Sequence, residues 1–103
     1  MSVALAPLAD FTNGEAKRLE AHGRTIVVVR INDDVYVLDD RCSHEDFPLS
    51  DGLVDAETCE IECTRHGAMF SLATGDAMTF PATTPVRRYD ARVVDGMVEV
   101  VWS

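Results

Sequence analysis

The stretch that decides the fold runs from Thr25 to Leu38 and reads TIVVVRINDDVYVL. Its two ends, Thr25–Ile31 and Val35–Leu38, are rich in β-branched residues, which favour extended strands. The polar residues Asn32-Asp33-Asp34 between them are typical of a turn. We therefore predict a β-hairpin over this stretch.

A second hairpin is predicted further along the chain. Residues Arg87–Val94 and Met97–Trp102 have a strand-like composition, and the glycine of the Asp95-Gly96 turn between them tolerates a positive φ. Helical periodicity is weak, and the one helix-compatible stretch, Gly14–His22, is equally compatible with a strand at a sheet edge. Strand signals dominate, so we predict an all-β fold.

Length and charge limit the functions open to the chain. It has 103 residues, enough for one domain, and a formal charge of −9 that argues against nucleic acid and anionic membranes as partners. Met1–Pro7 does not resemble a signal peptide, and the run Ile26–Val29 is far too short to span a membrane. We expect a cytoplasmic protein, whose reduced cysteines serve as metal ligands, catalytic groups or core residues.

Residues 39–86 differ from the two hairpins. This middle segment is rich in Asp, Gly, Pro, Ser and Thr, and it holds all three cysteines and two of the three histidines. A long irregular segment in a small domain usually carries a functional site. The sequence therefore predicts a β framework that presents a loop-rich insert.

Two short motifs in this insert combine a thiol with an imidazole: Cys42-Ser43-His44 and Cys63-Thr64-Arg65-His66. Together they offer four ligands for a closed site. Tetrahedral zinc accepts two Cys and two His, but its sites usually group like with like. A [2Fe–2S] cluster can take two thiolates on one iron and two imidazoles on the other, which suits the interleaved spacing. The remaining alternative is that the four residues share no site.

At this point the sequence resembles a known family, the Rieske-type ferredoxins. Their pattern is C-x-H, a spacer, C-x₂-H-G-x-x-F and a T-G turn. The matching residues here are Cys42-Ser43-His44, Cys63-Thr64-Arg65-His66-Gly67-Ala68-Met69-Phe70 and Thr74-Gly75, followed by Pro81-Ala82, Pro85, Tyr89 and Val93. The spacer of 18 residues between His44 and Cys63 is slightly longer than usual, which we assign to a longer turn near Asp55-Ala56-Glu57.

The resemblance implies a single Rieske domain over residues 1–103, an antiparallel β sandwich whose cluster-binding subdomain covers approximately 39–86. It also implies one [2Fe–2S] cluster, with Cys42 and Cys63 on one iron and His44 and His66 on the other.

The resemblance further implies a low reduction potential. High-potential members have a disulfide between the cluster loops, and the matching positions here are Phe47 and Arg65. They also have a Ser and a Tyr that donate hydrogen bonds to sulfur, where this chain has Ala68 and Phe70. Without these donors we expect the low end of the Rieske range, roughly −150 mV.

By the same resemblance, the chain is a soluble carrier of single electrons rather than an enzyme, passing them from a flavin-dependent reductase to a terminal, aromatic-ring-hydroxylating oxygenase. Nine of its 18 acidic residues lie between Asp39 and Glu62, where Arg41 is the one Lys or Arg. This run is either a solvated face or a docking surface for basic partners. The alternatives are a small redox subunit, such as that of nitrite reductase, an iron–sulfur assembly protein, or a structural zinc module.

Three further predictions concern residues near or outside the motifs. Cys59 alternates with Glu60 and Glu62 and shares the parity of Ile61, so we expect a buried strand residue rather than a ligand. His22 beside Gly23 is expected on the surface. The apolar residues Phe47, Pro48, Leu49 and Pro81 either shield the cluster or pack in the core.

Overall fold

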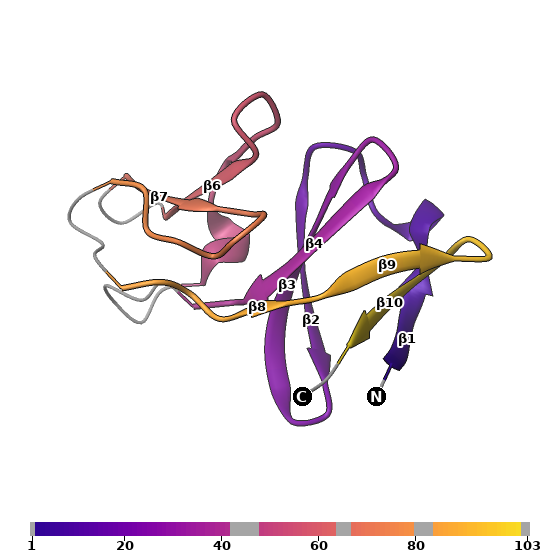
Figure 1. Ribbon diagram of the computed structural model, residues 1–103. Helices are drawn as coiled ribbons and strands as arrows, with labels where there is room; N and C mark the ends of the chain where they lie inside the picture. Colours follow the sequence, from indigo (N-terminus) through magenta and orange to yellow (C-terminus); the bar gives the residue numbers. More distant parts are fainter. Residues whose placement is uncertain (1, 42–47, 64–66, 80–83, 102–103) are drawn as a thin grey trace.

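The computed structural model describes residues 2–41, 48–63, 67–79 and 84–101. Three antiparallel sheets make up the fold, in the strand orders β1-β10-β9, β2-β3-β4-β8 and β5-β6-β7 (Figure 1). The strands are β1 (Ser2–Pro7), β2 (Ala16–Ala21), β3 (Arg24–Ile31), β4 (Asp34–Asp39), β5 (Val54–Asp55), β6 (Glu60–Cys63), β7 (Ala68–Ser71), β8 (Arg88–Tyr89), β9 (Ala91–Val94) and β10 (Met97–Val101). Two short 3₁₀ turns, η1 (Leu8–Asp10) and η2 (Leu49–Asp51), complete the described elements.

The sheet of β2, β3, β4 and β8 lies between the other two, which explains why the apolar run of β3 is continuous. Ile26 and Val28 pack on one side, together with Val98 and Val100 of β10. Val27 and Val29 pack on the other side, in one cluster with Ile61, Phe70 and other residues of the β5-β6-β7 region. Successive strand residues face opposite ways, so a strand covered on both faces must be apolar at every position.

The predicted first hairpin is confirmed as β3 and β4, which pair from Ile26 with Asp39 to Ile31 with Asp34. The stretch at Gly14–His22 is strand β2, at the edge of the sheet, and not a helix. Strand β1, near the N-terminus, was not predicted; it pairs with β10.

The second hairpin is confirmed only in part. β9 and β10 pair across Asp95 and Gly96, whose φ values of 50° and 77° suit a tight two-residue turn. The expected strand from Arg87 to Val94 is interrupted at Asp90, however, and its first part, β8, pairs with β4 in a different sheet. The chain thus changes sheets at Asp90.

The sheet of β5, β6 and β7 lies between β4 and β8 in sequence, inside the segment predicted to carry the site. In Figure 1 this sheet stands to one side of the other two. The boundaries of the insert at 39 and 86, and its assignment as part of one domain, stay predictions. In the described part of the chain, no helix is long and apolar enough to span a membrane.

Candidate metal centre

Of the four predicted ligands, the structure describes Cys63. It is the last residue of β6, it is 1% exposed, and it pairs with Ala68, the first residue of β7. Cys42, His44 and His66 lie outside the described residues, so their positions stay predictions. The residues that flank the two motifs are described, and they define the surroundings of the centre.

The second motif begins at the last residue of β6 and is followed by Gly67, which precedes β7. The Gly67 amide donates a hydrogen bond of 2.9 Å to the Cys63 carbonyl, and Gly67 has a φ of 70°. A residue with a side chain is disfavoured in that conformation, which accounts for the glycine of the motif. The two strands thus hold both ends of the His66 segment at a fixed separation.

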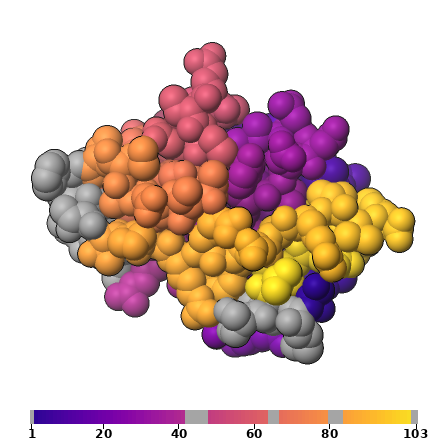
Figure 2. Space-filling view, viewed as in Figure 1, coloured from indigo at the N-terminus to yellow at the C-terminus, as the bar shows by residue number. Residues whose placement is uncertain are grey.

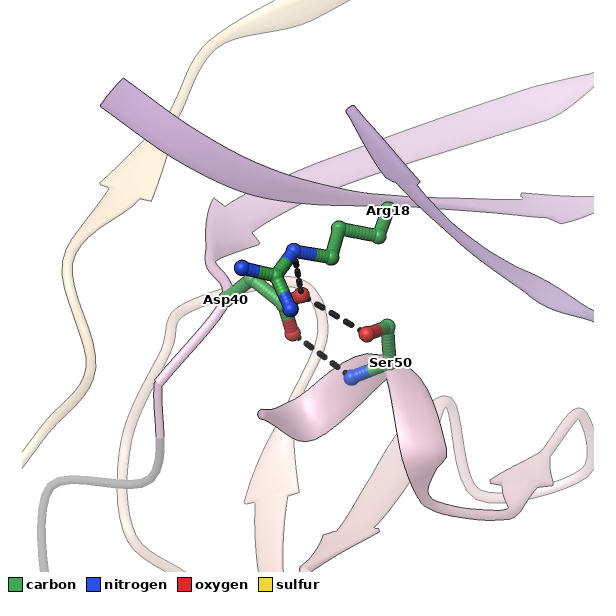
Figure 3. A network of polar contacts seen from close by, with 3 residues as sticks. All are labelled: Arg18, Asp40 and Ser50. Atoms are coloured by element: carbon green, nitrogen blue, oxygen red, sulfur yellow. Dashed lines mark hydrogen bonds and ion pairs between the residues drawn. The ribbon is translucent and has the colours of Figure 1, made fainter. Parts of the chain in front are cut away.

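The first motif is held at its base by a clamp of three residues, shown in Figure 3. Asp40, just before the motif, accepts hydrogen bonds from the backbone nitrogen of Ser50 (2.6 Å) and from its hydroxyl (2.7 Å). Arg18 of β2 approaches the same carboxylate, with Nε 3.6 Å from Oδ2. The Asp40 side chain is fully buried, and a buried carboxylate is costly unless it is paired in this way.

Described residues beside both motifs belong to one apolar cluster. Leu49, two residues after the first undescribed segment, is fully buried and belongs to the same cluster as Cys63, Ala68 and Phe70. Gly52 brings η2 against β6 so closely that a Cβ there would overlap the Glu62 carbonyl oxygen. The return of the first loop is thereby packed on the strand that ends at Cys63.

The segment after β7 folds back along that strand. Met78 donates to the Met69 carbonyl (2.8 Å), and Met69 in turn donates to the Thr79 hydroxyl (2.9 Å). The turn between them contains Gly75, where a Cβ would overlap the Val86 carbonyl oxygen and where φ is +81°. Gly75 and Val86 therefore tie together the two sides of the undescribed segment 80–83, through a hydrogen bond of 2.8 Å from the Val86 amide to the Gly75 carbonyl.

These flanks fit a cluster held by two thiolates and two imidazoles. Cys63 lies among apolar side chains, an environment that excludes water from a metal-bound sulfur. Ala68 and Phe70 are both fully buried beside it, and neither side chain can donate a hydrogen bond. No set of three or more His, Cys, Asp or Glu side chains converges within the described ranges, so the ligand set depends on Cys42, His44 and His66.

The prediction for Cys59 is wrong in part. Cys59 is half-buried and lies in the turn before β6 with a φ of 58°, so it is not a strand residue. The alternation starts one residue later, with Ile61 and Cys63 buried. A hydrogen bond with the Cys59 side chain, together with burial, raises the pKa of Tyr36 above its usual value. Its contacts with Tyr36 and the core cluster give Cys59 a packing role in this structure.

The other neighbours of the motifs are placed as follows. His22 is exposed in the β2–β3 turn, as predicted. Leu49 is a core residue rather than an exposed shield, and Pro48 is half-buried. Phe47 and Pro81 lie outside the described residues, as do Ala82 and Arg65.

The acidic run is less exposed than its composition suggests. Asp39 accepts a hydrogen bond of 2.6 Å from the Tyr89 hydroxyl, and Asp40 is buried in the clamp. Among the described acids of the run, Asp51, Asp55 and Glu57 are exposed. The last two lie at the β5–β6 turn, which protrudes from the surface (Figure 2).

Beside this turn, four residues form a row across the outer face of the β5-β6-β7 sheet, which we call the outer row. The backbone amide of Glu62 donates a hydrogen bond of 2.9 Å to the Leu53 carbonyl. Glu62 of β6 pairs with Met69 of β7, and the Met69 carbonyl accepts a hydrogen bond from the Met78 amide. Leu53 is 72% exposed and Met78 is 52% exposed. A hollow of about 450 Å³ next to the row is lined by Leu53, Met69, Asp55, Glu57 and Glu62 among others. The row, made of Leu53, Glu62, Met69 and Met78, is therefore apolar except for Glu62, and Asp55 and Glu57 lie at its rim.

Sequence reasoning missed the clamp. Its three residues come from β2, the end of β4 and η2, and their separation in sequence gives no signal that they meet. The one sequence feature that could have pointed to it is Asp40, two residues before Cys42, which was assigned to the acidic run instead.

Comparison with known proteins gives a consistent picture. A family model described as "Rieske [2Fe-2S] domain" matches residues 1–90. The anthranilate 1,2-dioxygenase ferredoxin subunit of Burkholderia cepacia is 38% identical over 96 residues, covering 93% of this chain and 87% of the relative. The 3-phenylpropionate/cinnamic acid dioxygenase ferredoxin subunit of Escherichia coli K12 is 36% identical over 90 residues, covering 87% of this chain and 83% of the relative.

Solved structures of other proteins share this fold. The ferredoxin of carbazole 1,9a-dioxygenase from Nocardioides aromaticivorans IC177 superposes with a TM-score of 0.95 at 33% identity, covering 99% of this chain and 98% of that one. A ferredoxin in complex with the oxygenase of carbazole 1,9a-dioxygenase gives 0.88 at 30% identity, covering 97% and 92%. A putative nitrite reductase small subunit gives 0.86 at 20% identity, covering 99% of each chain, a likeness of fold alone.

Proposed function

Because this chain belongs to the Rieske [2Fe–2S] domain family, we propose that it is the ferredoxin of a multicomponent dioxygenase, a carrier that takes one electron from a flavin-dependent reductase and delivers it to a terminal, ring-hydroxylating oxygenase. The observation that carries the proposal is the similarity over nearly the whole chain to ferredoxin subunits of such dioxygenases. The family's cofactor is one Rieske-type [2Fe–2S] cluster, which gains and loses a single electron when bound.

In this proposal Cys42 and Cys63 would hold one iron through thiolates, and His44 and His66 would hold the other through ring nitrogens. Burial of Cys63 keeps water from its sulfur. The Asp40 clamp holds the loop of Cys42 and His44 at its base, and the Gly67–Cys63 hydrogen bond closes the turn of His66. Ligands fixed in this way move little when the charge changes, which favours rapid electron transfer.

The proposal includes a potential at the low end of the Rieske range. Ala68 and Phe70 offer no side-chain donor that would stabilise the reduced state, and the positions matching the cysteines of the family's loop disulfide are Phe47 and Arg65. The net charge of −9 also opposes the addition of an electron. Both effects lower the potential, toward roughly −150 mV rather than +300 mV.

For one redox partner, we propose docking through the outer row and its acidic rim. Exposed Leu53 and Met78 supply apolar contact, while Asp55, Glu57 and Glu62 attract a basic surface. Electron transfer to a terminal oxygenase should then slow as ionic strength rises. We place this exchange in the cytoplasm, where thiols stay reduced.

A coulometric titration of the purified protein tests the carrier function. One electron per chain, together with two irons and two acid-labile sulfides, is the expected result. A zinc protein without a redox transition would contradict the proposal. A large subunit that co-purifies in fixed proportion would favour instead the small-subunit role that the nitrite reductase likeness represents.

A further inference from the structure

A second charged surface lies at the end of the central sheet, where β4 leads into the first predicted ligand loop. It is a cleft of about 390 Å³ with arginines from four separate segments of the chain, which we call the arginine cleft. Its lining residues are Arg18, Arg24, Thr25, Asp39, Asp40, Arg41, Arg87 and Tyr89.

Tyr89 orders the arginines of the cleft. Its ring, which is almost completely buried, has the guanidinium carbons of Arg24 and Arg87 at 5.8 Å and 5.2 Å from its centroid. Its hydroxyl donates to Asp39 and accepts a hydrogen bond of 3.4 Å from Arg24. Guanidinium groups held over an aromatic ring lose less side-chain freedom on binding an anion than free ones do.

The described lining of the cleft is richer in basic than in acidic residues, unlike the chain as a whole. It includes four of the nine basic residues and two acids, whereas the whole chain has 18 acids and a net charge of −9. Both acids are engaged inside the cleft: Asp40 in the clamp and Asp39 with Tyr89. A surface of this kind is unexpected in a protein with a pI near 4.5.

The cleft also reaches Arg41, the residue before the first predicted motif. Arg41 directly precedes Cys42, and the Asp39 amide donates to the Arg87 carbonyl at 2.9 Å. A smaller hollow of about 220 Å³ extends from the cleft and is lined by Arg41, Arg87 and Pro85 among others. A partner seated here would lie next to the loop that carries two of the four predicted ligands.

We propose that the arginine cleft docks a carboxylate-bearing surface of a redox partner protein, on a face separate from the outer row. This inference rests on the proposed function. Arginine binds carboxylates in a bidentate geometry, and several such pairs fix orientation as well as contact. A carrier that meets a donor and an acceptor in turn gains from two surfaces of opposite charge, because each then attracts one partner and repels the other.

The local charge of the cleft decides the attraction at moderate salt. The molecule measures 39 × 28 × 19 Å, whereas the Debye length is about 10 Å at 0.1 M ionic strength. Acids on distant faces are then screened, and an approaching carboxylate interacts mainly with the cleft. Net charge and local charge therefore predict opposite responses to salt.

A gold electrode coated with a carboxylate-terminated monolayer serves as a defined acidic surface. The cluster-loaded protein is studied by voltammetry between 0.1 M and 1 M ionic strength, where the Debye length falls to about 3 Å. Docking through the cleft predicts that electron exchange slows as salt increases. A rate that rises with salt would mean that the net charge governs the encounter, and it would overturn the proposal.

Two neighbouring residues supply a matched pair of variants. Arg87→Glu and Arg88→Glu change the net charge equally, but Arg88 is absent from the lining of the cleft and pairs with Asp90 at 2.7 Å. We expect Arg87→Glu to slow exchange at 0.1 M by about tenfold and Arg88→Glu to leave it within about twofold of the wild-type rate. Equal effects of the two variants would contradict docking through the cleft.

Arg24→Gln gives a second test that adds no negative charge, and we expect it to slow exchange severalfold on the same electrode. Docking through the cleft also predicts slower exchange when phosphate replaces chloride at constant ionic strength, because phosphate competes for the same arginines; an equal slowing in Arg87→Glu would contradict it. Each variant is first examined at an uncharged graphite electrode. If the wild-type protein gives a reversible signal at graphite but the predicted salt and variant effects are absent at the carboxylate-terminated monolayer, the docking proposal alone is refuted. If the wild-type protein gives no signal at graphite, the proposed function is refuted.

Discussion

Ser50 donates two hydrogen bonds to the buried carboxylate of Asp40, from its backbone nitrogen at 2.6 Å and its hydroxyl at 2.7 Å. The two residues lie on either side of the undescribed segment that contains Cys42 and His44. They close the base of that loop, and they do so without any covalent link. We expect this contact to help hold the loop, since the chain has Phe47 and Arg65 at the positions that match the cysteines of the family's loop disulfide.

Replacing Asp40 by Asn should weaken the hold on the loop. The amide loses the charge and keeps one acceptor oxygen where the carboxylate has two, so one of the two Ser50 bonds is lost and we expect a loss of about 2 kcal/mol in the free energy of unfolding. Urea denaturation followed through the visible absorbance of the cluster measures it. Arg18→Gln is the control, because that guanidinium is half-exposed at 3.6 Å and should cost less than about 1 kcal/mol. Equal losses in the two variants would show that Ser50 does not depend on the carboxylate.

Ala68→Ser should raise the reduction potential by tens of millivolts, a fraction of the Rieske range of roughly 450 mV. Ala68 is fully buried and pairs with Cys63, so a hydroxyl there can donate toward sulfur and stabilise the reduced state. Protein-film voltammetry gives the value. Ala68→Gly, which adds no donor, should leave the potential nearly unchanged. An intact EPR spectrum with no rise for the serine variant would refute the proposal that missing donors keep the potential low.

Gly75 and Gly96 separate backbone strain from steric overlap. Their φ values are +81° and +77°, but a Cβ at Gly75 would overlap the Val86 carbonyl oxygen, while nothing lies within 4 Å at Gly96. We expect Gly96→Ala to cost about 1 kcal/mol, the price of a left-handed alanine. Gly75→Ala should cost at least about 2 kcal/mol more, since the turn must move away from Val86. Thermal melting of both variants checks the difference, and similar melting temperatures would contradict it.

The pKa of Tyr89 is raised, first by burial and then by its hydrogen bond to Asp39. Because the folded state holds this proton more tightly than the unfolded chain, its contribution to stability is full below about pH 10 and is lost as the pH rises above that value. Tyr89→Phe should therefore reduce the fall in unfolding free energy above about pH 10, as measured by urea denaturation across that range. The pKa of Tyr36 is raised as well, so Tyr36→Phe is the comparison. Only the variant with both substitutions should remove both contributions to the pH dependence. An unchanged slope in Tyr89→Phe would refute the assignment.

Much of the fold could be predicted from the sequence, because β-branched runs and turn residues indicate the backbone conformation of their own segment. The run at Ile26–Val29 identified β3, and its continuous apolar character follows from burial on both faces. The change of sheet at Asp90 left no such trace. The residues on both sides of Asp90 have strand-like composition, and which neighbour each strand pairs with is decided by packing of distant segments.

The ligand set of the candidate site stays a prediction from the Cys and His spacing, since the structure describes Cys63 alone among the four residues. The surroundings of the site were harder to predict. Parity assigned Cys59 to a strand, but the turn before β6 needs a left-handed residue there, which alternation cannot reveal. Composition likewise placed Asp39 and Asp40 on an acidic surface, whereas hydrogen bonds from Tyr89 and Ser50 draw them inward.

The central claim is that Cys42, His44, Cys63 and His66 hold a Rieske-type cluster, and EPR of the dithionite-reduced protein tests it most directly. Two imidazoles on one iron lower the average g value below that of an all-cysteine cluster, and their nitrogens add hyperfine couplings resolved by pulsed measurements. We predict a low average g with two nitrogen couplings in the wild-type protein. In His44→Cys and His66→Cys, we expect loss of one coupling each. A spectrum typical of four-cysteine ligation, or couplings that survive both substitutions, would contradict the account.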